Sequence, residues 1–179
     1  GVAYKLWSKG EDGALAAFPP AEIEAADLTG LALELAVWGS EGLPFLTAPP
    51  EGALREAQDL LSALGALDAG RITNHGRALA KLPLHPRLAR LVVAGHEAGA
   101  LAVATRAAAL LAERDIVQRP RDGRHDGRSA SAAYATDSDL MDRLDALQRS
   151  ETGGYAETAV GPLARGPARF VMRAAKQIA

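Results

Sequence analysis

The spacing of apolar residues changes along the chain from the period of a strand to the period of helices. Val2, Tyr4 and Leu6 alternate with other residues, which predicts a short strand with one buried face. After an acidic, glycine-containing link, apolar residues recur every three or four positions, as on one face of a helix. The sequence therefore predicts a mainly α protein that begins with one strand.

Two helices, a small hairpin and a third helix are predicted in the first half. The first helix starts after Asp27 as N-cap, ends at Gly39, and has an apolar face of Leu28, Leu31, Leu35 and Trp38. The second ends at Gly65, and its apolar face consists of Leu54, Ala57, Leu61 and Leu64. Residues 66–72 can form a hairpin, and Thr73 can cap a helix that runs to about Lys81, before Pro83. This inventory is that of a winged-helix module.

Longer helices are predicted in the second half. They cover 87–98, 101–113, a stretch after a Thr136–Asp139 capping box, and 167–179. Their expected core positions are Leu88, Leu91, Val92, Gly95, then Leu101, Ala104, Ala108, Leu111, then Leu140, Leu144, Leu147, and finally Phe170, Ala174 and Ile178. Residues 118–135 lack any apolar period and predict a flexible loop.

The charge is distributed unevenly, although the net charge is only -2. Residues 1–70 carry 3 basic and 11 acidic side chains, whereas residues 71–179 carry 17 basic and 11 acidic ones. A basic half permits contact with polyanions but does not establish it, because an Arg-rich composition also follows from a GC-rich genome.

No autonomous active site is visible in the sequence. The chain has no Cys, which excludes disulfides and thiolate chemistry. Residues 161–166 have the glycine spacing of a phosphate loop, but Pro167 and Ala168 stand where Lys and a hydroxyl are needed. His96-Glu97 lacks the second His of a zinc-protease helix. We expect Asp137, Asp139, Asp142 and Asp145 to be solvated carboxylates at a helix start. The longest apolar stretch, 100–112, is too short to cross a bilayer.

Several sequence blocks together resemble the segment that follows the last helicase motif of DEAH-box helicases. They are 1–8 (GVAYKLWS), 31–39 (LALELAVWG), 45–50 (FLTAPP), 72–80 (ITNHGRALA) and 82–91 (LPLHPRLARL). The His-containing LPLHP block and the Ala-rich helices after it are most similar to the bacterial HrpB-type branch. The resemblance extends over residues 1 to about 116 and weakens beyond.

The resemblance implies a division of the chain and a role for each part. Residues 1–15 would hold the remnant of the last strand of the second RecA-like motor domain and a linker. Residues 16–82 would be the winged-helix domain, and 84–179 the helicase-associated helical bundle, or ratchet domain. The chain would thus be cut from a longer protein whose ATP- and Mg²⁺-binding motifs lie upstream, and this fragment would bind neither cofactor and hydrolyse no ATP.

The function implied is that of a noncatalytic accessory region of a cytoplasmic ATP-dependent nucleic-acid helicase. It would help form the channel for single-stranded RNA or DNA and couple the RecA-like motor domains to strand movement, with no membrane partner. An alternative is a protein-interaction module that docks partners or the helicase's own C-terminal region. A free-standing winged-helix regulator fits less well. Its second helix would have to contact DNA, but Arg55 is the only basic residue there beside Glu51, Glu56 and Asp59, and such a helix would repel phosphate.

Candidate strand-contacting residues lie in the last helix and in the loop. Arg169, Arg173 and Lys176 share one helix face, roughly 100 degrees from the expected Phe170 face. They are either a phosphate-binding row or a solvated face whose cations suit the C-terminal end of a helix. Arg124 and Arg128 could reach a nucleic acid from the loop, but Asp122 and Asp126 offset their charge, and a variable insertion is the alternative.

Overall fold

The structure, a computed structural model, describes residue 2 and residues 4–16, 18–39, 43–113, 115–117, 138–151, 157–158 and 161–179. The elements in chain order are α1 (Lys9–Ala14), α2 (Glu22–Ala25), α3 (Thr29–Trp38), α4 (Glu51–Ala63), β1 (Leu67–Asp68), β2 (Arg71–Ile72), α5 (Asn74–Leu79), α6 (Pro86–Glu97), α7 (Leu101–Ala112), α8 (Asp139–Glu151), β3 (Glu157–Thr158), β4 (Gly161–Pro162) and α9 (Arg165–Ile178). The described part is mainly helical, as predicted.

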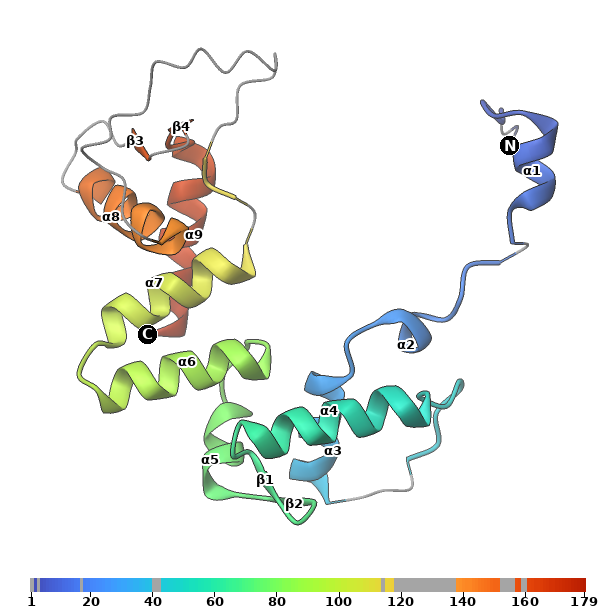
Figure 1. Cartoon of the computed structure of the whole chain (residues 1–179), viewed down its shortest axis with the longest axis horizontal. Coiled ribbons are helices and arrows are strands. Elements are labelled where there is room, and N and C mark those ends of the chain that lie inside the picture. The colour runs from blue at the N-terminus through green and yellow to red at the C-terminus, as the bar shows by residue number, and fades with distance from the viewer. Residues whose placement is uncertain are drawn as a thin grey trace.

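The first residues form an arm that stands apart from the rest of the chain, with α1 at its end (Figure 1). Ser8 and Glu11 form a capping box that starts α1. The strand predicted from Val2, Tyr4 and Leu6 is not formed: residues 4–6 belong to no strand, and Tyr4 and Leu6 are 84% and 94% exposed. Among the described residues no strand pairs with them to supply the ladder of hydrogen bonds that a strand requires.

The winged-helix lobe consists of α3, α4, the β1–β2 hairpin and α5. Its core is built from Leu28, Ala32, Leu33, Ala57, Leu61, Ala66, Leu67, Leu79 and Ala89. The face predicted for α4 is confirmed, with Ala57 and Leu61 buried. The face predicted for α3 is partly wrong, because Trp38 is 73% exposed. The sequence of α3 is apolar almost all round, so several faces could serve equally well as the buried one.

Local hydrogen bonds fix the hairpin and the start of α5. The hairpin pairs Leu67 with Ile72 in antiparallel register, and its two turn residues, Ala69 and Gly70, have φ values of 45° and 75°. Positive φ at both positions is what the favoured two-residue turn requires. Thr73 caps α5 as predicted: its hydroxyl accepts a hydrogen bond from the Gly76 amide at 2.9 Å and donates one to the Gly65 carbonyl at 2.7 Å.

The bundle lobe is organised around α7, which packs against α6, α8 and α9. Its core contains Ala107, Ala109, Leu110, Ile116, Val117, Leu144, Leu147, Ala168, Val171 and Ala175. The helices α6 and α7 approach closely at Gly95, where an added Cβ would collide with the Cβ of Ala104. Leu111, predicted as a core residue of α7, is instead 56% exposed. Because most other side chains of α7 are small, this helix buries a broad surface rather than the single predicted stripe.

Two features near α8 differ from the sequence prediction. Asp142 is only 5% exposed, not solvated as expected, since it lies on the same side of α8 as the buried Ala146. The β3–β4 hairpin was not predicted, because two-residue strands that include Gly161 and Pro162 show no alternating pattern. The Thr136 cap and the loop 118–135 lie outside the described residues.

The helix α6 joins the two lobes, lying between α5 and α7 (Figure 1). Its Ala89 belongs to the winged-helix core, whereas Leu91 packs against the bundle core. At its start, His85 Nδ1 accepts a hydrogen bond from the Arg87 amide at 3.3 Å, and His85 Nε2 lies 3.3 Å from Asp27 Oδ2. This contact links the two ends of the winged-helix lobe. No helix in the described ranges is long and apolar enough to span a membrane.

Candidate nucleic-acid interface

The last helix, α9, is strongly amphipathic. Ala168, Val171 and Ala175 are buried against the bundle, and α7 supplies the main surface they pack on. The helix sequence, RGPARFVMRAAKQI, contains four cations and no acidic residue. Segregation of apolar and polar side chains at helical period therefore leaves the charged residues facing away from the core.

The three residues predicted to share a face of α9 are all exposed. Arg169, Arg173 and Lys176 are joined by Arg165 at the first position of the helix. At 3.6 residues per turn the four side chains leave the helix within a sector of about 80 degrees. None of them forms an ion pair or side-chain hydrogen bond with any residue that the structure describes. The described side chains thus leave this row of charge unneutralised.

Phe170 does not lie in the core, contrary to the sequence prediction. Its side chain is 54% exposed, and Ala174 and Ile178 are only half-buried. The prediction failed because the buried residues of α9 are 168, 171 and 175. This row is rotated about 100 degrees around the helix from the predicted one, which corresponds to a shift of one residue. A large aromatic side chain beside exposed cations was the feature that sequence reasoning missed.

The loop residues Arg124 and Arg128 lie outside the described residues. Of the five predicted contact residues, Arg169, Arg173 and Lys176 are the ones whose placement the structure gives. In the described ranges, no group of three or more His, Cys, Asp or Glu side chains could hold a metal ion.

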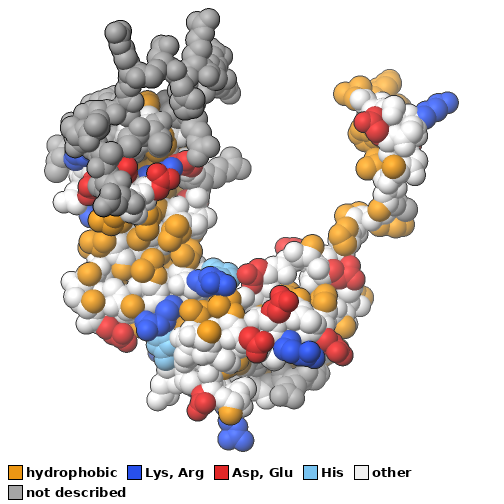
Figure 2. Space-filling model, in the orientation of Figure 1, with side chains coloured by type: hydrophobic (Ala, Val, Ile, Leu, Met, Phe, Trp, Pro, Cys, Tyr) orange, Lys and Arg blue, Asp and Glu red, His pale blue; other side chains and the backbone are white. Residues whose placement is uncertain are grey.

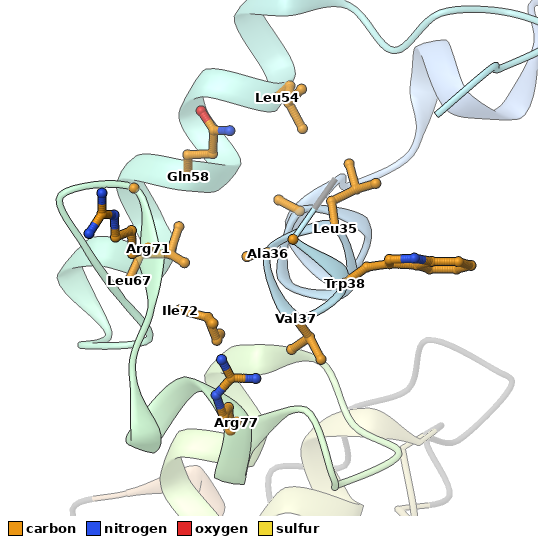
Figure 3. Close-up of a pocket in the computed structure, with 13 residues that line it drawn as sticks. Leu35, Ala36, Val37, Trp38, Leu54, Gln58, Leu67, Arg71, Ile72 and Arg77 are labelled. Carbon is orange, nitrogen blue, oxygen red and sulfur yellow. The ribbon is translucent and has the colours of Figure 1, made fainter. Parts of the chain in front are cut away.

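A second surface feature is a groove of about 840 Å³ in the winged-helix lobe. Its apolar lining comes from α3, α4 and the hairpin, and Arg71 and Arg77 lie around it (Figure 3). Trp38 extends outward from the end of α3 beside the groove. Neither guanidinium group is paired with a described carboxylate. The sequence did not predict this groove, because its lining comes from segments far apart in the chain.

The rest of the winged-helix lobe is acidic. Arg55 is flanked on α4 by the exposed residues Glu51, Glu56 and Asp59, and acidic side chains lie over this lobe on the face shown in Figure 2. Carboxylates repel a phosphate backbone, so α4 is unsuited to act as a DNA-recognition helix. The basic face of α9 is therefore the better candidate for contact with nucleic acid.

Comparison with known proteins agrees with the winged-helix assignment. Residues 57–84 match the family described as the helicase associated domain (HA2), winged-helix. The chain is 32% identical over 175 residues to the ATP-dependent RNA helicase HrpB of Escherichia coli, which covers 93% of this chain and 20% of HrpB. The E. coli ATP-dependent RNA helicase HrpA is 29% identical over 131 residues, which covers 68% of this chain and 10% of HrpA.

A solved structure also shows similarity to HrpB. The crystal structure of the E. coli DEAH/RHA helicase HrpB matches 94% of this chain and 20% of that protein, with a TM-score of 0.56 and 29% identity. The chain carries the HA2 winged helix of DEAH/RHA helicases. More particularly, it resembles the HrpB C-terminal region in both sequence and structure. It spans about a fifth of the length of HrpB.

Proposed function

We propose that this chain is the noncatalytic accessory region of an ATP-dependent DEAH-box RNA helicase, and that it helps form the channel for the single strand. The observation that carries the proposal is the exposed, acid-free row of Arg165, Arg169, Arg173 and Lys176 on α9. Proteins that follow single strands without sequence preference use such positive surfaces to track the backbone. Arg suits this task because its guanidinium group can contact phosphate through two donors.

The arm and the winged-helix lobe would connect the strand-contacting surface to the RecA-like motor domains. Tyr4, Leu6 and Phe18 are each more than 80% exposed, and large exposed apolar side chains gathered on one short segment are typical of a surface that meets another protein or domain. Docking of the arm on the second motor domain would cover them. Motor-domain motion would then be transmitted through the winged helix and α6 to the bundle lobe.

ATP chemistry would belong to the parent protein, with ATP and Mg²⁺ bound by motor domains outside this chain. We expect the purified 179-residue chain to show no ATP hydrolysis above a buffer control in a phosphate-release assay. ATP hydrolysis that stays in constant proportion to the chain through successive purification steps would refute the noncatalytic assignment.

The strand-contact proposal is tested by the salt dependence of binding to oligouridylate. With Arg169, Arg173 and Lys176 changed to Ala, the log–log slope of affinity against salt should fall by about two units, at roughly 0.7 per phosphate contact on a single strand. A matched control removes three exposed cations elsewhere, namely Lys9, Arg55 and Arg87. The control should leave the slope nearly unchanged; equal effects of the two variants would show that only net charge matters.

A protein-interaction role is a second candidate, and the groove beside Trp38 is the observation that favours it. An apolar lining with two unpaired Arg side chains suits a peptide that carries apolar and acidic residues. Under this alternative, Trp38→Ser would abolish partner binding and leave the affinity for oligouridylate unchanged.

A further inference from the structure

We infer that Phe170 stacks on an unpaired base of the strand, so that α9 recognises bases as well as phosphates. This inference rests on the proposed function, because it needs a strand on the basic face of α9. It adds a contact of different chemistry: the aromatic ring binds the face of a base, whereas the cations bind the backbone. The ligand class that follows is single-stranded nucleic acid with accessible bases.

Phe170 is exposed, although the core beside its helix is well filled. In the described residues of the bundle lobe it is the only aromatic side chain, yet it is 54% exposed while the core beside it is filled by Ala, Val, Leu and Ile. A phenylalanine is among the residues most often found inside proteins. The bundle core is therefore completed without it, and its ring remains available to a ligand.

Phe170 lies next to the cations on the surface of α9. At 3.6 residues per turn its side chain leaves α9 about 60 degrees from that of Arg173, on the edge of the basic sector. Arg173 is three positions further along the helix, so the two side chains are neighbours on its surface. A strand whose phosphates meet the cations would thus present its bases to the side on which Phe170 lies.

The basic row is long enough to contact several nucleotides. From Arg165 to Lys176 the helix rises about 16 Å at 1.5 Å per residue. This distance accommodates about five nucleotides at roughly 3.4 Å each. One stacking residue for a segment of this size is consistent with sequence-tolerant binding, because every base has a face on which a ring can stack.

The test compares oligonucleotides with and without bases. Fluorescence anisotropy of the full 179-residue chain is measured with a labelled thymidine 12-mer, a uridine 12-mer, and an abasic 12-mer that keeps the phosphate backbone. Phe170→Ala should weaken binding to both base-containing strands about five- to tenfold, at the low end of what stacking supplies. It should leave the abasic strand and the salt slope unchanged, and Phe170→Trp should restore or improve affinity.

Two outcomes would overturn the inference. If Phe170→Ala binds the thymidine and uridine strands as the native chain does, the ring does not stack. If it weakens the abasic strand equally, its effect acts through the fold, which a parallel thermal unfolding measurement would reveal. The proposed function is tested separately: it fails if the variant with Arg169, Arg173 and Lys176 changed to Ala keeps the native salt slope. If that variant has a reduced slope but Phe170→Ala binds with native affinity, only the stacking contact is refuted.

Discussion

At the scale of single residues, two helical glycines with different surroundings provide a matched test of the packing. A Cβ added at Gly95 would collide with the Cβ of Ala104, whereas one added at Gly52 would meet nothing within 4 Å. Gly95→Ala should therefore lower the free energy of unfolding by about 1–3 kcal/mol through overpacking. Gly52→Ala should raise it by about 0.5–1 kcal/mol, because Ala loses less backbone entropy in a helix. Urea unfolding followed by circular dichroism measures both.

Arg143 holds the start of α8 against the segment after α7. Its guanidinium group donates to both Asp115 oxygens, at 3.1 and 3.2 Å, and to the Asp139 carbonyl at 3.0 Å. The hydrogen bonds that the guanidinium donates to Asp115 are the main cause that raises the pKa of Arg143. We expect Arg143→Ala to cost about 1–2 kcal/mol of unfolding free energy.

Arg143→Lys separates charge from geometry at the same position. Lysine keeps the charge but cannot form the two-pronged contact, so it should recover less than half of the loss. A lysine variant as stable as the native chain in urea would show that charge alone is responsible. The exposed Arg87→Ala should cost almost nothing and serves as the control.

Predicting single positions from sequence succeeded where a cap or a turn decides the conformation, as at Thr73 and Gly39. It failed where the choice lay between adjacent rows of a helix, as at Phe170 and Asp142. Neighbouring residues on a helix differ by about 100 degrees, and Ala-rich sequence offers several apolar rows of similar quality. For the candidate site, the helical period predicted that Arg169, Arg173 and Lys176 share a face, but it did not predict that the Phe170 ring beside them is exposed.

At the scale of elements, a pH-dependent hydrogen bond lies at the start of α3, where the N-cap residue is Leu28 and not Asp27 as predicted. The Thr29 amide donates to Asp27 Oδ1 at 2.7 Å. Hydrogen bonding by the Thr29 side chain and then by this amide, with a smaller contribution from His85, lowers the pKa of Asp27. Because the pKa is lower in the folded state, the stabilisation is complete above the unfolded value of about 3.9 and disappears as the pH falls through the folded value. Asp27→Ala should cost about 0.5–1 kcal/mol at pH 7.

The difference in stability between Asp27→Ala and the native chain should therefore shrink below about pH 4. Urea midpoints at pH 7 and pH 3 measure this difference. A stability gap that stays constant across this range would mean that the carboxylate charge contributes nothing to this hydrogen bond. Asp68→Ala, at an exposed position of β1, supplies a comparison outside any helix start.

Among the features of the elements, the positions at which helices begin and end were the most predictable. Both ends of α4 and α6 and the start of α7 follow from glycine and proline signals that act within about one turn, so sequence alone locates them. The strand expected at the start of the chain was not formed, because strand pairing depends on a neighbour that no local pattern provides. The β3–β4 hairpin escaped prediction for the opposite reason, since its partners are close in sequence but too short to show a period.

At the scale of the whole molecule, two hydrophobic cores share one uninterrupted helix. The winged-helix core includes Ala89 of α6, which is fully buried. The other side of the same helix meets α7 at Gly95 and contributes Leu91 to the bundle core. Unfolding of either lobe would remove the support from one side of α6. This arrangement links the bundle lobe, which we propose contacts the strand, to the lobe that we propose meets the motor domains.

We therefore expect a cavity in one core to weaken both lobes. Leu61 is fully buried in the winged-helix core, and Leu61→Ala should lower the unfolding free energy by about 2–4 kcal/mol. Native-state hydrogen exchange should show this loss at amides of α7 and α9 as well as at those of α4. Leu147→Ala, in the bundle core, should produce the converse effect, and Leu46→Ala, at a fully exposed side chain, should change neither lobe. Unchanged protection of α7 in Leu61→Ala would mean that the lobes unfold independently, and force could not then pass from one to the other through α6.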